Sequence, residues 1–388
     1  MVNERYQQQS IPDLFARRAT QLAIKLQKHI TSSGPIPVSN YVQACLKDPE
    51  HGYYIHNPAI GAAGDFVTAP EISQIFGELI GIWCVIVWRH MGEPEQLNLL
   101  ELGPGRGTLM SDMLRVIAKL PKLKDGLDIH LLETNQTLRQ QQKQTLQKKT
   151  EHFTHYNNAA LLHDAARQTG APWIVVGNEF LDALGVRQLV TRNGVWHERT
   201  VQLNSDGQLC FGIGESLETY DAGWPDAEKA PDGEIFEIIP EIDATIIPLL
   251  RALIHHSPVA SLFIDYGYEQ TRCGETLQAV RRHAYEHPLT SPGEADLTVH
   301  VDFSRIAAAF QKANMTPHTV MTQAEFLGRL GIVERTSQLM SANPDRASDL
   351  ETATLRLIAP NGMGGLFKTI AASSPHLSPL PIFGAAGI

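Results

Sequence analysis

The feature that most constrains this chain is a short apolar run, residues 97–102, that ends in a glycine-rich turn. The run is rich in leucine, which predicts a strand buried on both faces of a parallel sheet. Gly103, Gly105 and Gly107 leave every second position of the turn without a side chain, so a ligand can approach the backbone closely. A helix predicted over residues 109–120 brings its N-terminal N–H groups to the same place. The sequence therefore predicts a ligand site at this turn.

Three nucleotide-type ligands compete for such a turn, and the spacing of the glycines separates them. A phosphate-binding P-loop needs a lysine after its last glycine, but Thr108 follows Gly107 directly. A dinucleotide site needs G-x-G-x-x-G, whereas the third glycine here comes one position early. Glu101, two residues before the turn, would repel a pyrophosphate and suits a cationic ammonium or sulfonium group. The pattern therefore favours S-adenosylmethionine as the ligand.

This cofactor also needs an acceptor for its ribose hydroxyls at the end of the next strand. Residues 127–132 form that next apolar segment, and Glu133 follows it directly. In the alternative interpretation, Glu101 is a surface acid and the glycines only reverse the chain. The order of strand, turn, helix, strand and acid favours the cofactor site instead.

Several segments, taken together and in order, resemble one known family. They are ELGPGRGTLM (101–110), GNEFLDAL (177–184), IDYG (264–267), DLTVHVDF (296–303) and MGGLFK (363–368), preceded by residues 51–81. The likeness runs from about Pro35 to Ala371 and is to the MidA (DUF185-type) family of S-adenosylmethionine-dependent methyltransferases. One departure is Gly185, which stands where the family usually has proline.

This resemblance implies an α/β fold of the class I methyltransferase type. Such a fold has a Rossmann-like doubly wound sheet with an antiparallel last strand, here with a helical N-terminal segment and a β-rich insertion. The expected regions are a helical N-terminal segment with a cofactor-covering loop (1–95), a first core part (96–185), a β-rich insertion near the substrate entrance (186–257), a second core part (258–372) and a flexible tail (373–388). Turns at Asn193–Gly194 and Asp206–Gly207 are typical of antiparallel hairpins in the insertion.

The resemblance also implies the reaction and its partner. It predicts methylation of a protein nitrogen, of arginine, with S-adenosylhomocysteine as the product. A subunit of respiratory complex I is then the expected protein partner, in a role in complex I assembly. Two alternatives remain open: a cofactor-binding assembly factor with vestigial catalysis, and a methyltransferase that acts on small molecules. The complete set of Glu101, Glu133, Asn178 and Glu179 favours an enzyme.

Candidate residues for the chemistry lie after the fourth core strand. Ligands of doubly wound folds bind at the carboxyl ends of strands, near the point where the strand order reverses. We expect Asn178 to contact the cofactor there, and Glu179 with Asp182 to be the catalytic pair that holds a planar guanidinium. Alternatively, Asn178 or Glu179 caps a following helix.

Two residues of the N-terminal region are further candidates for the cofactor site. Asp65 and Thr68 lie in the expected cofactor-covering loop, where they can bond polar groups of adenosine or methionine. Thr68 with Glu71 also fits a capping box at the start of an apolar helix. The sequence leaves these two interpretations open.

Charge and cysteine content exclude several other classes of function. The formal net charge of −10 argues against a nucleic-acid partner, which would require a basic face. The four cysteines lack C-x-x-C spacing, and no metal site is expected.

Membrane insertion and export are not expected either. The most apolar run, residues 79–88, is half the length of a membrane span and is better explained as a buried helix from near Pro70 to Met91–Gly92. No apolar signal core stands in the first residues, so a cytoplasmic location is expected, or the mitochondrial matrix for a eukaryotic source. The oligomeric state is not indicated.

Overall fold

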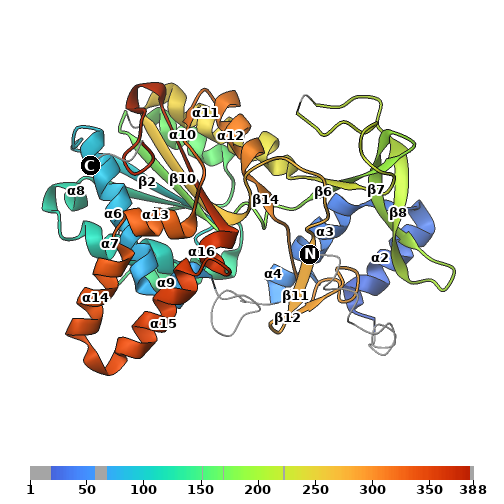
Figure 1. Ribbon diagram of the computed structural model, residues 1–388, viewed down its shortest axis with the longest axis horizontal. Helices are drawn as coiled ribbons and strands as arrows, with labels where there is room; N and C mark the ends of the chain where they lie inside the picture. Colours follow the sequence, from blue (N-terminus) through green and yellow to red (C-terminus); the bar gives the residue numbers. More distant parts are fainter. Residues whose placement is uncertain (1–18, 57–67, 151, 169, 222, 385–388) are drawn as a thin grey trace. The chain divides into compact units, whose positions relative to one another are not determined.

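The computed structural model describes residues 19–56, 68–150, 152–168, 170–221 and 223–384, and Figure 1 shows their helices and strands. The described residues fall into two compact units. The first draws on Met1–Phe66, Asp182–Glu241 and Gln270–His300, and the second on Val67–Leu181, Ile242–Glu269 and Val301–Ile388. The chain thus passes between the units several times, and each unit is built from separate segments.

A nine-stranded sheet forms the centre of the second unit. Its main path runs β15 (Thr316–Pro317), β17 (Phe367–Ser373), β10 (Val259–Tyr268), β5 (Trp173–Asn178), β2 (Leu97–Leu102), β3 (Leu127–Leu132) and β4 (Thr154–Tyr156); β14 (Val301–Asp302) pairs with β10 and β16 (Met321–Thr322) with β17. The strands from β4 to β10 are parallel, whereas β17 runs antiparallel to β10. This arrangement confirms the predicted doubly wound sheet with an antiparallel last strand.

Helices cover both faces of this sheet, with α10, α11 and α12 on one side and α6, α7 and α13 on the other (Figure 1). The helices of this unit are α5 (Ala69–Ile72), α6 (Gln74–His90), α7 (Thr108–Ile117), α8 (Pro121–Asp125), α9 (Gln136–Leu146), α10 (Ala160–Gln168), α11 (Ile247–His256), α12 (Phe303–Lys312), α13 (Gln323–Arg329), α14 (Ile332–Ala342), α15 (Ala347–Ile358) and α16 (Met363–Leu366), with short turns of other helix types at Ile242–Ile246, Pro344–Arg346 and Pro375–Leu377. Part of the stretch expected to be a flexible tail is packed, because Leu380 and Phe383 are buried in the core.

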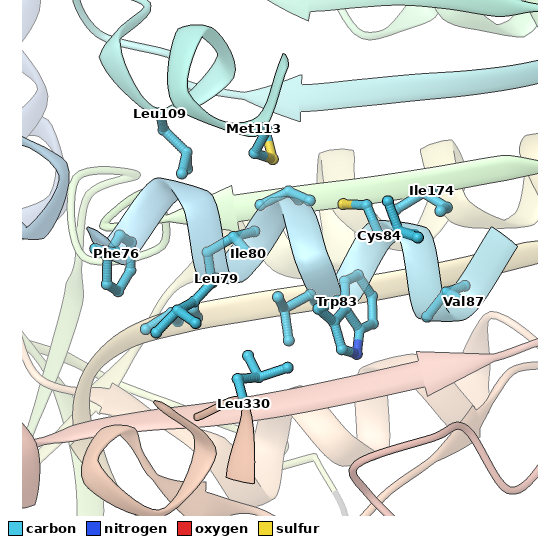
Figure 2. Close-up of a cluster of buried hydrophobic side chains, with 14 of the residues drawn as sticks. Phe76, Leu79, Ile80, Trp83, Cys84, Val87, Leu109, Met113, Ile174 and Leu330 are labelled. Carbon is cyan, nitrogen blue, oxygen red and sulfur yellow. The ribbon is translucent and has the colours of Figure 1, made fainter. Parts of the chain in front are cut away.

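The apolar run around residues 79–88 forms the buried helix α6, as expected. Side chains along α6 contact α7, the sheet and the region of Leu330 (Figure 2). A Cβ on Gly81 would lie 2.9 Å from the Cα of Met113, so glycine allows α6 and α7 to approach closely. The helix does not run unbroken from Pro70, because Ser73 adopts an extended conformation and its hydroxyl accepts a hydrogen bond from Ile75 N.

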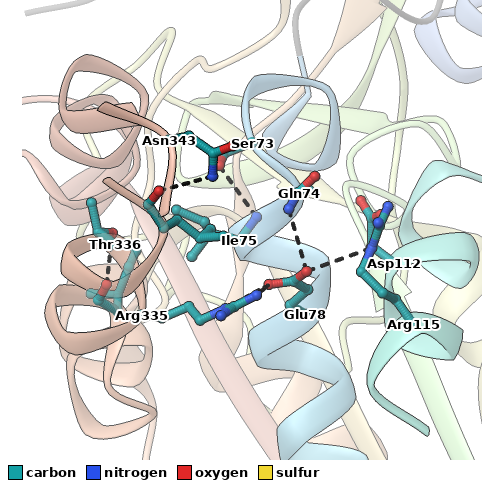
Figure 3. A network of polar contacts seen from close by, with 11 residues as sticks. Ser73, Gln74, Ile75, Glu78, Asp112, Arg115, Arg335, Thr336 and Asn343 are labelled. Carbon is teal, nitrogen blue, oxygen red and sulfur yellow. Dashed lines mark hydrogen bonds and ion pairs between the residues drawn. The ribbon is translucent and has the colours of Figure 1, made fainter. Parts of the chain in front are cut away.

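One carboxylate, that of Glu78, is buried on α6 between two arginines (Figure 3). Both Nε and an Nη of Arg335, on α14, lie 2.8 Å from Glu78 Oε2. Arg115 Nε, on α7, lies 3.5 Å from Glu78 Oε1. This buried charge therefore joins α6 to helices on either side of it.

We expect Glu78→Gln to destabilise the protein without changing its ligand affinity. The variant removes the charge while both arginines remain, and loss of one partner of a buried ion pair is costly. Because Arg115 and Arg335 are 42% and 26% exposed, we expect about 1–3 kcal/mol rather than the full cost of a dry pair. Urea unfolding measures this loss, with the exposed Glu351→Gln on α15 as a matched control. Equal midpoints for the two variants would contradict the expected role of Glu78.

The first unit holds two antiparallel sheets. One runs β1 (Ile36–Pro37), β7 (Val195–Leu203), β6 (Arg187–Arg192) and β9 (Ile235–Ile238), with β8 (Leu209–Ser216) beside β7; the other runs β12 (Ala284–Glu286), β11 (Gln278–Arg281) and β13 (Asp296–Thr298). Its helices are α2 (Gln21–Ser33), α3 (Val38–Lys47) and α4 (Tyr53–His56). The expected Asn193–Gly194 hairpin is present, and both residues have positive φ, of 52° and 72°.

Two structural features are absent from the described residues. No helix in the described ranges is both long and apolar enough to cross a lipid bilayer. In the same ranges, no group of three or more His, Cys, Asp or Glu side chains is arranged to hold a metal ion.

Candidate active site

The glycine-rich turn between β2 and α7 has a backbone that requires glycine. Gly103, Gly105 and Gly107 have φ values of 62°, 52° and 80°, in the left-handed region that side chains disfavour. At Gly103 a Cβ would also lie 2.7 Å from the ring of Phe180. Gly107 is the N-cap of α7, so the first N–H groups of this helix lie at the turn.

Glu101 lies at the same edge of the sheet and is almost completely buried. Its Oε2 atom has no hydrogen-bond partner within the described part of the chain. Burial, together with the nearby Glu133 carboxylate, raises the pKa of Glu101 to about 8, against a backbone hydrogen bond from Met110 that lowers it. A buried carboxylate of this kind is stable as an anion only next to a cation, which fits the expected ammonium or sulfonium group.

Glu133 follows β3, and its two carboxylate oxygens are both held. Asn135 N donates to Oε1 over 2.8 Å, and Gln142 Nε2 lies 3.4 Å from Oε2. Burial raises the pKa of Glu133, although these hydrogen bonds act in the opposite direction. The carboxylate is thus fixed at the end of the strand next to β2, where the sequence predicted a ribose acceptor.

Asn178 and Glu179 stand at the end of β5, the other neighbour of β2. The Glu179 Oε1 atom accepts hydrogen bonds from Ala69 N at 2.8 Å and from Asn178 Nδ2 at 3.2 Å. Glu179 has a φ of 50°, an unusual conformation for a residue with a side chain and one that concentrates at functional sites. The next element after β5 is the strand β6, so neither residue caps a following helix as the alternative supposed.

Asn178 adds a second buried acceptor to this edge of the sheet. Its Oδ1 has no hydrogen-bond partner within the described residues. Ile264 of β10 pairs with Asn178, and Leu102 pairs with Gly177, so Glu101 and Asn178 lie near the carboxyl ends of adjacent strands. Two orphaned acceptors at one sheet edge fit a ligand that carries N–H donors.

The remaining predicted site residues are Asp182, Asp65 and Thr68. Asp182 is buried and belongs to the first unit, whereas Glu179 belongs to the second, so their pairing stays a prediction. Asp65 lies outside the described residues. Thr68 is the N-cap residue of α5, and its side chain makes no capping hydrogen bond.

Glu71 does not complete a capping box with Thr68. Its Oε1 instead accepts a hydrogen bond of 2.6 Å from Thr108 Oγ1, in the first turn of α7, and its Oε2 lies 3.5 Å from Arg106. The short helix α5 is therefore tied to the glycine turn. The sequence gives no local sign of this contact between residues 37 positions apart.

Two further residues near the site make contacts that the sequence did not indicate. Asp265 Oδ2 accepts a hydrogen bond of 2.9 Å from Leu181 N and so holds the segment that follows Glu179. Gln142 is completely buried and bonds Gly105 as well as Glu133. A signal for Gln142 was present in the sequence, because it interrupts an apolar row that also holds Leu138 and Leu146.

Comparisons with known proteins identify relatives of this chain. The profile of a family of S-adenosyl-L-methionine-dependent methyltransferases matches residues 79–321. A relative from Danio rerio, named protein arginine methyltransferase NDUFAF7, mitochondrial, is 35% identical over 88% of this chain and 84% of that protein. The corresponding homolog from Drosophila melanogaster is 34% identical over 94% of this chain and 88% of that protein.

A solved structure provides a comparison of the fold and of the bound cofactor product. A COG1565 superfamily protein from Burkholderia thailandensis, bound to S-adenosyl-homocysteine, has a TM-score of 0.74 and 27% identity. The match covers 91% of each chain. This likeness includes the doubly wound sheet that carries the glycine turn.

The comparisons also correct one expectation. A cytoplasmic location is contradicted, since the curated relatives are named as mitochondrial proteins. That expectation depended on the lack of an apolar signal core in the first residues. Such a lack does not determine the location of a protein in the cell.

The glycine turn, its flanking carboxylates and these matches lead to one conclusion. The chain belongs to the MidA-type family of S-adenosylmethionine-dependent methyltransferases.

Proposed function

We propose that this enzyme transfers a methyl group to an arginine nitrogen of a protein substrate. The curated relatives are named protein arginine methyltransferases and align along most of the chain. The observation that carries the proposal is the carboxylate of Glu179, held at the end of β5 on a residue of unusual backbone conformation. A carboxylate binds the planar guanidinium group through paired N–H donors. The resemblance to the MidA family points to a subunit of respiratory complex I as the protein substrate.

In this proposal the residues around the glycine turn hold the cofactor. Glu101 Oε2 and Asn178 Oδ1, which lack partners within the described residues, accept hydrogen bonds from the ammonium group of its methionine part. Glu133 accepts from the ribose hydroxyls. S-adenosylmethionine, when bound, supplies an electrophilic methyl group on a positively charged sulfur. Thr68, and Asp65 outside the described residues, remain predicted contacts.

Glu179 acts on the arginine. A guanidinium is always protonated in proteins and is therefore a weak nucleophile. When a carboxylate binds two of its N–H groups, positive charge concentrates on the bound nitrogens and leaves more electron density on the nitrogen that attacks. The two hydrogen bonds to Glu179 Oε1 keep its carboxylate oriented for this task. Asp182 stays the predicted second carboxylate.

A transfer assay with tritiated S-adenosylmethionine and a mitochondrial lysate tests the proposed reaction. We expect label in protein, and hydrolysis of that protein should release methylated arginine. Label on lysine or on small molecules would overturn the arginine assignment. Binding of S-adenosylhomocysteine without any transfer would instead favour an assembly factor with vestigial catalysis.

The raised pKa of Glu101 predicts that cofactor binding releases a proton. With a pKa of about 8, roughly nine in ten Glu101 side chains are protonated at pH 7 in the free protein. A bound cation stabilises the anion, so affinity should rise about tenfold per pH unit up to about pH 8. Calorimetry in buffers of different ionisation enthalpy measures the released proton, which should be absent in Glu101→Gln. An affinity independent of pH between 6 and 8 would contradict a neutral Glu101 in the free protein.

The same shift has a consequence for stability. Because folding raises the pKa of Glu101, its favourable contribution is complete at pH values below the unfolded pKa of about 4.3 and is lost as pH rises to about 8. Glu101→Gln should therefore raise the melting temperature of the cofactor-free protein at pH 9, and much less at pH 5. The wild type should regain this difference when S-adenosylhomocysteine is added.

A further inference from the structure

The amide of Gln142 occupies an unusual position in α9. Leu138, Gln142 and Leu146 follow one another at intervals of four residues and are the buried residues of this helix. Gln142 is 0% exposed. A leucine would suit this row, since a buried amide is unfavourable unless its hydrogen bonds are made. A glutamine at this position therefore needs hydrogen-bond partners for its amide.

Three hydrogen-bond partners surround the Gln142 amide. Its Nε2 donates to the carbonyl oxygen of Gly105 over 2.7 Å and lies 3.4 Å from Oε2 of Glu133. Its Oε1 lies 2.8 Å from Nε2 of His155, on β4. One side chain thus contacts the glycine turn, the predicted ribose acceptor and a third strand.

The chemistry of these partners allows one orientation of the amide. A backbone carbonyl and a carboxylate oxygen only accept hydrogen bonds, so the NH₂ group must face Gly105 and Glu133. The amide oxygen then faces His155, which must carry a proton on Nε2 in order to donate. Burial and the nearby Lys143 and Arg139 lower the pKa of His155, which favours the neutral ring near pH 7. The hydrogen bond to the amide oxygen then selects the tautomer with the proton on Nε2.

Gln142 also lies directly against the backbone of the glycine-rich turn. A Cβ on Gly107 would lie 3.5 Å from the Cα of Gln142, so the backbone of α9 packs directly against the turn. Asn135 holds the other oxygen of Glu133. The Gln142 amide therefore sets the position of Glu133 relative to Gly105, two groups that come from different strands.

We propose that Gln142 is a positioning residue of the cofactor site, which fixes the glycine turn and the Glu133 carboxylate in the arrangement that S-adenosylmethionine requires. This inference depends on the proposed contact between Glu133 and the ribose. Gln142 itself need not touch the ligand. Because Gln142 already holds the glycine turn and the Glu133 carboxylate in the free protein, the ligand does not have to supply the free energy for ordering them.

Calorimetric titration with S-adenosylhomocysteine tests the proposal. Gln142→Met keeps the size of the side chain but removes its donor, and we expect affinity to fall about 10- to 100-fold, since one lost bond goes to a carboxylate. The matched control is Gln144→Met, the same change at an exposed position of α9, which should leave affinity within about twofold. In steady-state assays the KM for the cofactor should rise in Gln142→Met, whereas the KM for the protein substrate should not.

A double-mutant cycle separates this role from a general loss of structure. Glu133→Ala alone should weaken binding, and Gln142→Met should cost clearly less in that background than in the wild type. Additive losses, or equal affinities of the two methionine variants, would overturn the inference. If Glu133→Ala binds as tightly as the wild type, the proposed ribose contact is wrong instead.

A second variant keeps the test independent of how well Gln142→Met folds. His155→Leu leaves Gln142 in place and removes the donor to its amide oxygen. We expect about 3- to 10-fold weaker binding of S-adenosylhomocysteine, from the loss of one neutral hydrogen bond. Unchanged affinity in this folded variant would contradict a role of the amide's hydrogen bonds in holding the cofactor site.

Discussion

Glu179→Gln is expected to lower the rate of methyl transfer by about 10- to 10⁴-fold while S-adenosylhomocysteine binds with unchanged affinity. Glutamine keeps the shape of the side chain, and its Oε1 can still accept the hydrogen bond from Ala69 N. What is lost is the negative charge. Hydrogen bonds between charged groups contribute about 1.5–3 kcal/mol each, and one or two of them would be missing when the guanidinium reacts.

Two further variants show whether this loss of methyl transfer is specific to Glu179. Glu351→Gln, at an exposed position of α15, should transfer methyl groups at the rate of the wild type. Glu133→Ala should show the converse of Glu179→Gln, with weaker cofactor binding and an unchanged KM for the protein substrate. Normal transfer by Glu179→Gln would mean that this carboxylate has only the structural role seen in its bond to Ala69.

Gly105→Val should abolish measurable binding of S-adenosylhomocysteine. The residue has a φ of 52°, a conformation that is a severe outlier for a β-branched side chain. Valine would also fill space that the cofactor needs when it approaches the backbone of the turn. Together these effects should reduce affinity by more than about 100-fold, which corresponds to about 2.7 kcal/mol.

Gly92→Val is the control variant for the effect of backbone strain by itself. Gly92 also has a positive φ, of 85°, and a Cβ there would meet nothing within 4 Å. Both variants should lose thermal stability, but Gly92→Val should bind S-adenosylhomocysteine normally when titrated by calorimetry below its melting temperature. Normal binding by Gly105→Val would contradict the cofactor site at this turn.

The parts of the site that could be predicted from the sequence are those encoded by neighbouring residues. The strand at 97–102, the glycine spacing and the acid two residues before the turn are all local, and so is Glu133 after the next strand. The prediction of an antiparallel last strand came from the resemblance to a known family. The structure then confirmed it through the pairing of β17 with β10.

What the sequence could not indicate are contacts between distant parts of the chain. Asp265 bonds Leu181 N, 84 residues away, and Gln142 bonds Gly105, 37 residues away. Periodicity cannot reveal such partners, since it reports only which face of an element is buried. The break at Ser73 was missed for another reason: apolar residues recur at helical spacing on both sides of it, at Ile72, Ile75 and Leu79, although Ser73 caps a new helix.

The order in which the strands appear along the chain bears on how the protein is synthesised. β10 forms seven residue pairs with β17, which follows β10 in the chain only after the whole segment from Glu269 to Leu366. A ribosome must therefore synthesise this whole segment before β10 gains its neighbour. Until then one side of a buried, apolar strand stays unpaired, which is the kind of edge that recruits other chains. A nascent or truncated chain that ends before Phe367 should accordingly depend on chaperones, whatever the state of its cofactor site.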